Sequence, residues 1–276
     1  MLREVNFLLY DSHTHSIYSF DGHHSPLEMC AGAESAGAAA FVITDHCDID
    51  GVLDGFYPVY DMDSARRAVE EANEAYAGRV RVWRGIELGE PSLRPEESAD
   101  LLRRGNFDFV IASCHNLANV PDFYFFDYTA MPMALAQDLY RRMLKELCGH
   151  AAFPGIHTVA HLSYPLRYMA KAGKKMDLDF FEADFRRLFS VMRENGAALE
   201  LNTKGLWTGG IDTDTERFIL RLWYDCGGRD VTIGSDAHRA TELCRGFDEG
   251  ISLLRECGFD HIVFPTERGI GSVSLQ

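Results

Sequence analysis

The chain has 276 residues, of which 46% are hydrophobic and 25% charged, a composition typical of a globular protein with a buried core. The 42 Asp and Glu outnumber the 27 Lys and Arg, and the resulting net charge of −15 argues against broad binding to a nucleic-acid backbone. No apolar stretch reaches the roughly 18 residues of a membrane span, and the seven cysteines form no C-x-x-C pair, so we expect a cytoplasmic protein without a disulfide framework or a thiolate zinc site.

Short runs rich in Val, Ile, Phe and Leu alternate with segments of helical periodicity, which predicts parallel strands joined by helices. We expect eight strands, at 7–11, 39–44, 80–86, 107–112, 158–160, 198–202, 230–234 and 261–264. Apolar residues at intervals of three and four predict a helix over 180–195, and another helix is expected after Asp63. No linker or repeat divides the chain, so we expect one domain over 1–276 with long loops at 47–61 and 116–132.

Histidines and carboxylates follow the first seven of these runs. In chain order they are His13, His15, Asp21, His46, Glu87, His115, His161, Asp236 and His238, with Glu200 to Lys204 at the end of the sixth run. Because the C-terminal ends of the strands in a parallel barrel meet at one mouth, we expect these side chains to converge.

The two pairs His13-x-His15 and Asp236-x-His238 each place two side chains on the same face of an extended segment. A single histidine after a strand is more often structural than a ligand. Six histidines and three carboxylates together predict a metal centre, because clustered buried carboxylates need cations to offset their repulsion. Imidazole and carboxylate ligands suit Zn, Mn or Fe, and nine ligands suffice for two or three ions.

The order of these motifs resembles the PHP (polymerase and histidinol phosphatase) superfamily: H-x-H near the N-terminus, T-D-H, a strand-end Glu, further single His residues and a late D-x-H. The segments LELNTKG (199–205) and GSDAH (234–238), with Asp at position 21, are most similar to its histidinol-phosphate phosphatase branch. The resemblance implies an α/β fold, a distorted (β/α)7 barrel with three divalent ions at the C-terminal mouth of the strands. The run at 261–264 would then be an extra edge or closing strand.

The resemblance also implies how the ligands are shared. His13, His15, Glu87 and Asp236 would hold one ion, with Glu87 bridging to a second ion held by His115 and His161, and Asp21, His46 and His238 would hold the third. His157 lies near His161 and would face the same way in an extended segment. We favour His161 because it begins the family-like sequence AHLSYP.

The function implied by the resemblance is metal-dependent hydrolysis of a small phosphomonoester, foremost L-histidinol phosphate in histidine biosynthesis, by a metal-bridging hydroxide. Glu87, Asp236 and His238 would lie at the reacting centre. The candidates for binding phosphate are Arg167, Lys204 and Arg239.

Three questions stay open at the level of sequence. The loop residues over 122–128 either surround the ammonium and imidazole of histidinol or simply pin the loop to the barrel. The substrate is alternatively a nucleotide or sugar phosphate, or the chain is a non-catalytic metal-binding module. The oligomeric state is not indicated.

Overall fold

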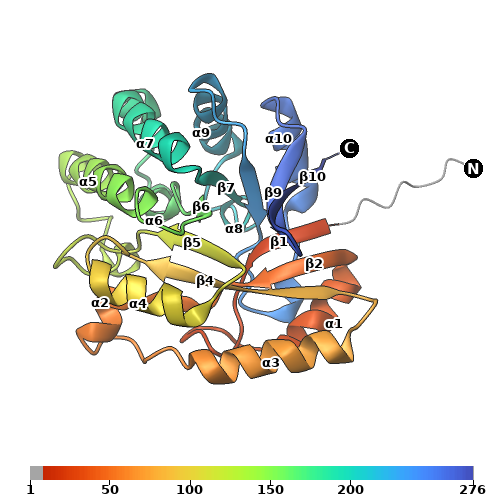
Figure 1. The fold of residues 1–276 in the computed structure, drawn as a ribbon. Coiled ribbons are helices and arrows are strands. Elements are labelled where there is room, and N and C mark those ends of the chain that lie inside the picture. The colour runs from red at the N-terminus through yellow and green to blue at the C-terminus, as the bar shows by residue number, and fades with distance from the viewer. Residues whose placement is uncertain (1–8, 276) are drawn as a thin grey trace, which may run out of the picture.

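The computed structural model describes residues 9–275 and consists of a parallel barrel surrounded by helices (Figure 1). The barrel strands are β1 (Leu9–Thr14), β2 (Ala38–Ile43), β4 (Arg81–Gly89), β5 (Phe109–Ser113), β6 (Thr158–Val159), β7 (Ala198–Asn202) and β8 (Val231–Gly234). They pair in this order, each parallel to the next. The fold is the expected distorted (β/α)7 barrel.

Backbone hydrogen bonds close the barrel between its first and last strands. The Asp236 N–H donates to the carbonyl of His13, and the His15 N–H donates to the carbonyl of Ala237, both at 2.8 Å. Because helices cover the outside, strands such as β5, β7 and β8 are buried along their whole length. This two-sided burial is why these strands appear in the sequence as short apolar runs.

The predicted strand positions agree with the structure, apart from end residues and two local differences. The first two residues of the first predicted strand, Phe7 and Leu8, lie outside the described residues. The short strand β3 (His46–Asp48) was not predicted, because three residues with two polar side chains carry no strand pattern. It pairs in parallel with β4 and places His46 opposite Glu87.

Ten α-helices lie in the described part of the chain. They are α1 (Pro26–Ala36), α2 (Ile49–Leu53), α3 (Met62–Ala75), α4 (Pro95–Gly105), α5 (Met133–Ala151), α6 (Tyr164–Lys171), α7 (Glu182–Asn195), α8 (Lys204–Trp207), α9 (Thr213–Asp225) and α10 (Phe247–Glu256). Both predicted helices are present. Helix α7 begins at Glu182, later than predicted, because a 3-10 turn, η2 (Leu178–Phe181), precedes it. At the start of α3, the Asp61 side chain caps the helix by accepting a hydrogen bond from the Ser64 N–H.

The last predicted strand is not a barrel strand. Strand β9 (His261–Thr266) pairs antiparallel with β10 (Gly269–Ser274) in a separate two-stranded sheet beside β8 and β1 (Figure 1). Phe264 of this hairpin packs with inward-facing residues of the barrel such as Val42 and Phe109. The end of the barrel interior that faces the hairpin is therefore apolar, whereas the histidines lie at the other end, where the strands terminate.

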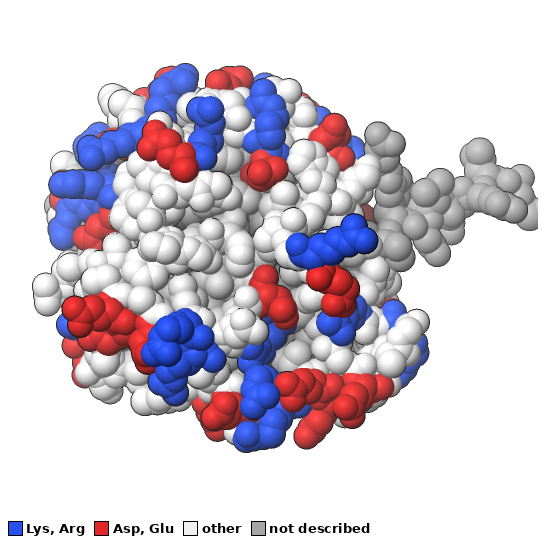
Figure 2. Space-filling model, in the orientation of Figure 1, with Lys and Arg blue, Asp and Glu red and all other residues white. Residues whose placement is uncertain are grey.

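Charged residues of both signs cover the surface. Figure 2 shows Lys and Arg side chains interspersed with Asp and Glu on one face of the molecule. Several form ion pairs, such as Arg217 with Glu256 at 2.8 Å and Arg79 with Glu34 at 3.1 Å. Within residues 9–275, no helix has both the length and the apolar character required to cross a membrane.

Candidate active site

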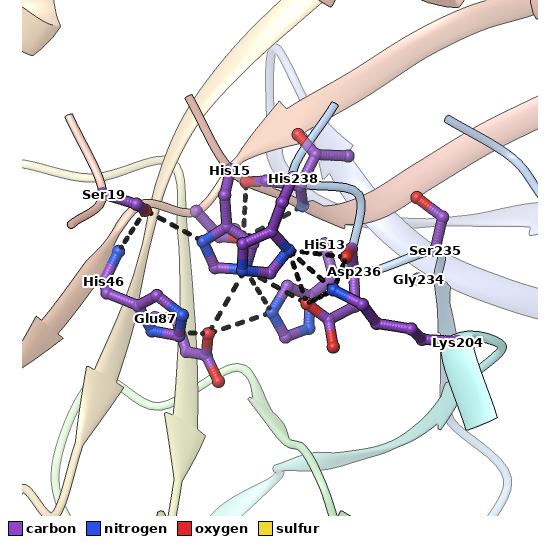
Figure 3. Close-up of polar contacts among 12 residues, drawn as sticks. His13, His15, Ser19, His46, Glu87, Lys204, Gly234, Ser235, Asp236 and His238 are labelled. Carbon is purple, nitrogen blue, oxygen red and sulfur yellow. Dashed lines mark hydrogen bonds and ion pairs between the residues drawn. The ribbon is translucent and has the colours of Figure 1, made fainter. Parts of the chain in front are cut away.

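The predicted ligand residues gather at the C-terminal mouth of the barrel, where Figure 3 shows side chains from separate strands pointing toward one another. Glu87 at the end of β4 lies at the centre of the group and is fully buried. Its Oε2 atom lies 3.1 Å from His13 Nε2 and 3.0 Å from His46 Nδ1. Its Oε1 atom lies 3.1 Å from His115 Nε2 and 2.9 Å from His161 Nε2. His15 Nε2 also lies 3.5 Å from Oε2, so Oε1 of Glu87 faces two imidazoles and Oε2 faces three.

A second set of contacts surrounds the segment after β8. His15 Nε2 lies 3.5 Å from Asp236 Oδ1, and His238 Nδ1 lies 3.4 Å from the same oxygen. Asp21 Oδ2 lies 2.9 Å from His238 Nε2, and Asp21 Oδ1 lies 3.8 Å from His46 Nε2. The Asp21 side chain is 42% exposed, so this edge of the cluster opens to solvent.

The donor set fits divalent metal ions. Four groups of three ligand atoms lie within 4.8 Å of one another: His13–His15–Asp236, His13–Glu87–His161, His46–Glu87–His115 and His15–His46–His238. Buried polar atoms normally have hydrogen-bond partners. Here Glu87 Oε1 and His46 Nδ1 are buried and make no hydrogen bond despite their close neighbours. A cation between these atoms would satisfy them.

Burial and the neighbouring charges act against each other at the two central carboxylates. Burial raises the pKa of Glu87, but the surrounding histidines, His46 and His13 foremost, hold it well below its ordinary value. Burial likewise raises the pKa of Asp236, and Lys204 is the leading group among those that bring it well below normal. Both carboxylates are therefore ionised and available to cations.

The pKa values of the two histidines in the H-x-H pair are shifted in opposite directions. Burial lowers the pKa of His13, but Glu200 and Glu87 outweigh burial and raise it well above normal. Burial and the neighbouring His238 lower the pKa of His15 well below normal. The carboxylates beside His13 thus favour its protonated form, whereas the surroundings of His15 favour the neutral form, which is the form able to bind a metal ion.

Two carboxylates that were not among the predicted ligands orient the histidines, although Glu200 was expected to converge with them. Glu200 Oε1 on β7 lies 2.5 Å from His13 Nδ1, and Glu200 Oε2 accepts from the His161 N–H at 3.3 Å. Asp48 Oδ1 on β3 lies 3.1 Å from His115 Nδ1. Such partners fix the ring orientation of metal-ligating histidines. The sequence does carry a signal for Glu200: it is a charged residue between two leucines in the apolar run that forms β7.

His157 and His161 lie in different surroundings. His161 reaches Glu87, whereas His157 Nδ1 accepts from the Val110 N–H at 2.9 Å and its ring stacks on Phe109. His161 and Asp236 both have the positive φ values rarely adopted outside glycine, 63° and 54°. Residues held in such conformations cluster at functional sites.

A cavity of about 460 Å³ lies over the cluster. Two of the three predicted phosphate-binding residues line it, Arg167 and Lys204. The third, Arg239, is not among the lining residues; it is exposed, and its Nη2 lies 3.0 Å from His23 Nε2. The cavity is also lined by an aromatic and acidic wall made of Phe20, Tyr57, Asp122, Tyr124, Phe125, Tyr164 and Tyr168.

Comparison with known proteins identifies the family. Residues 11–204 match the family model described as PHP domain, which is more than half of the chain. The chain belongs to the PHP domain family. A probable histidinol-phosphatase of Thermotoga maritima is 31% identical to this PHP domain protein over 91% of the chain and 94% of the relative. A histidinol-phosphatase of Lactococcus lactis is 25% identical over 91% and 92%, respectively.

A solved structure has the same fold. It is histidinol phosphate phosphatase from Lactococcus lactis complexed with zinc, L-histidinol and phosphate, with a TM-score of 0.79 and 18% identity over 95% of this chain and 98% of that one. The expected superfamily and barrel are thereby confirmed. So is the enzyme class, a phosphomonoester hydrolase, by the relatives that share most of this PHP domain chain.

Proposed function

We propose that this PHP domain protein hydrolyses L-histidinol phosphate to L-histidinol and inorganic phosphate, using three divalent metal ions of the zinc, manganese or iron type. The main support is the buried Glu87 carboxylate, which contacts two imidazoles through Oε1 and three through Oε2, beside a cavity lined by the buried Arg167 guanidinium. The names of the relatives supply the substrate.

Nine side chains would hold the ions. In the proposed assignment, His13, His15, Glu87 and Asp236 hold the first, Glu87 with His115 and His161 the second, and Asp21, His46 and His238 the third. The contacts of His46 with Glu87 and of His15 with His238 bring the three sets into one cluster. Bound ions would supply an acidified water and positive charge near the phosphoryl oxygens, so no Ser or Cys nucleophile is required.

Arg167 is the best placed side chain for the phosphate. It is only 9% exposed, and its guanidinium lies over the Tyr164 ring at 4.8 Å, with Nη1 3.9 Å from Asp236 Oδ2. Arg167 lines the cavity, and its buried Nε atom has no hydrogen-bond partner, so the guanidinium retains an unused donor. A planar guanidinium binds phosphate oxygens through two parallel hydrogen bonds.

Lys204 would act mainly on the reacting centre. Its Nζ atom lies 2.7 Å from both His238 Nδ1 and the Asp236 carbonyl. In this position the ammonium group orients His238 and keeps Asp236 ionised. We assign it a supporting role in phosphate binding, since its hydrogen bonds are already engaged.

Asp122 would receive the ammonium group of histidinol. It accepts hydrogen bonds from the Tyr164 hydroxyl at 3.0 Å and the Tyr124 N–H at 2.7 Å, which fixes the carboxylate at the cavity. In this proposal the loop would serve both expected purposes: Phe123 and Tyr128 are buried and anchor it, whereas Tyr124 and Phe125 are exposed and line the cavity. Aromatic faces beside a carboxylate suit a cationic, imidazole-bearing alcohol.

The test is phosphate release from a panel of histidinol phosphate, nucleoside monophosphates and sugar phosphates by enzyme of measured metal content. We expect histidinol phosphate to be preferred by at least about tenfold in kcat/KM, roughly 1.4 kcal/mol. Preference for another monoester would replace the substrate. Metal binding without release from any monoester would instead indicate a non-catalytic module.

A further inference from the structure

A second group of potential metal ligands lies outside the barrel mouth, between β5 and α5. Cys114 follows β5 directly before His115, and Glu146 and His150 lie on α5. Successive side chains at a strand end point to opposite sides, so that His115 enters the mouth while Cys114 faces the helix. Glu146 and His150 are four residues apart and share one face of α5. One ligand atom of each residue lies within 4.8 Å of the other two.

Two polar atoms of this group lack hydrogen-bond partners, whereas the Cys114 thiol donates to the Asn116 carbonyl at 3.2 Å. His150 is fully buried, and its Nδ1 lies 2.7 Å from Ser92 Oγ, but its Nε2 makes no hydrogen bond. One carboxylate oxygen of Glu146 accepts from the Ala118 N–H, but its Oε2 is buried without a hydrogen-bond partner. Buried polar atoms without partners are rare in folded proteins and call for a physical explanation. Both belong to the residues that have a ligand atom within 4.8 Å of the Cys114 sulfur.

We propose that Cys114, Glu146 and His150 form a zinc site separate from the catalytic cluster. Thiolate, imidazole and carboxylate are the side chains that bind Zn²⁺, at about 2.0–2.3 Å, which places ligands of a tetrahedral ion roughly 3.3–3.8 Å apart. Spacings of up to 4.8 Å require only small side-chain rotations to reach these distances. Water would complete the coordination, with access along the half-buried Glu146.

The surroundings of His150 suit a ligand. Burial lowers its pKa to about 3, so the imidazole is neutral at physiological pH. Nδ1 lies 2.7 Å from Ser92 Oγ and 3.4 Å from the Ser92 backbone nitrogen. In the tautomer that donates from Nδ1 to Ser92 Oγ, the lone pair is on Nε2, the arrangement common among metal-binding histidines. Binding of Zn²⁺ would replace the Cys114 S–H bond by a Zn–S bond and release the proton that the thiol donates to the Asn116 carbonyl, while His150 and Glu146 would displace waters of the hydrated ion.

The site would join the end of β5 to the outer helix. Cys114 precedes a catalytic-cluster histidine by one residue, and the loop that carries Asp122 begins immediately after it. An ion at this point would fix the backbone between the barrel and the substrate loop. The absence of C-x-x-C argues against paired thiolates, whereas this site uses one thiolate and two ligands from a distant helix, a combination that no short spacing reveals.

Cobalt provides the test, because Co²⁺ replaces Zn²⁺ and a thiolate ligand gives a near-ultraviolet charge-transfer band that imidazole and carboxylate ligands do not give. We expect this band in the full-length protein titrated with Co²⁺. Cys114→Ser should abolish it and lower the bound metal by one ion per chain, and Glu146→Gln should weaken it. Cys148→Ser is the matched control, since Cys148 lies on the same helix but outside the group.

Absence of the band in the wild-type protein at saturating Co²⁺ would overturn the proposal, as would a band that survives in Cys114→Ser. If Cys114→Ser fails to fold, Glu146→Gln and the wild-type spectrum still decide, because Glu146 is partly exposed on the helix surface. The readout is independent of phosphatase activity. An inactive enzyme with the band would therefore contradict the proposed function without affecting this site.

Discussion

Glu200 offers a sharp test of how the metal cluster is supported, because it contacts two predicted ligands without being one. Its carboxylate accepts from His13 Nδ1 at 2.5 Å and from the His161 N–H at 3.3 Å. A carboxylate behind a histidine raises the basicity of the ligating nitrogen and holds the ring in place. Glu200→Gln retains an acceptor oxygen but removes the charge and turns an NH₂ group toward one of the two donors.

The expected magnitude follows from these contacts. Loss of a supporting carboxylate typically weakens metal binding by about 10- to 100-fold, equivalent to roughly 1.4–2.7 kcal/mol. Glu200→Gln is expected near the lower limit because one hydrogen bond persists, and Glu200→Ala near the upper limit because both are lost. Activity at saturating metal should change little, since the ligands themselves remain.

The assay is competition for Zn²⁺ with a chromophoric chelator, accompanied by activity as a function of free Zn²⁺ at one pH. Glu216→Gln is a matched control, because Glu216 is also a buried carboxyl group but hydrogen-bonds Ser163 and contacts no predicted ligand. An unchanged zinc affinity in Glu200→Gln, or an equal loss in Glu216→Gln, would refute the supporting role.

Three further predictions address other parts of the molecule. Glu87→Gln should reduce the occupancy of two ions together and abolish activity; full metal content by elemental analysis would exclude a bridging role. Arg167→Lys should lower kcat/KM by about 10- to 100-fold, in line with the roughly 1.5–3 kcal/mol of a charge-assisted hydrogen bond, while metal content stays unchanged. Burial raises the pKa of Glu216 to about 7 from an ordinary 4.5, so its contribution to stability is present below pH 4.5 and is lost as the pH rises through 7. Glu216→Gln should therefore gain stability relative to wild type by at most about 3 kcal/mol between pH 4 and pH 8; an equal difference at both pH values in thermal unfolding would contradict this.

The barrel and the converging ligands could be predicted because both leave strong patterns in the sequence. Parallel strands buried on both faces are continuous apolar runs, and the residues after them share one mouth. The hairpin could not be assigned, because β10 (GIGSVS) has too few apolar residues to predict the antiparallel partner of β9. The first turn before α7 has the same apolar spacing as the helix, so periodicity alone placed the helix start two residues early.

The supporting residues of the site were less accessible to sequence reasoning. Asp48 lies on a three-residue strand within a predicted loop, and only pairing with β4 places it behind His115. Arg239 was expected at the cavity because it follows His238, but neighbours in sequence diverge where the chain turns after β8. The direction in which a loop side chain points is decided by tertiary contacts, and residue type and spacing do not reveal those contacts.

The closure of the barrel has a mechanical consequence. The hydrogen bonds that join β1 to the segment after β8 involve His13, His15 and Asp236 themselves, so the predicted ligands are also the seam of the barrel. An ion held by these three side chains would fasten two parts of the chain that are more than 200 residues apart in sequence. Chelation should then loosen the barrel first along this seam, and amide hydrogen exchange should rise at β1 and β8 before it rises at β4 and β5.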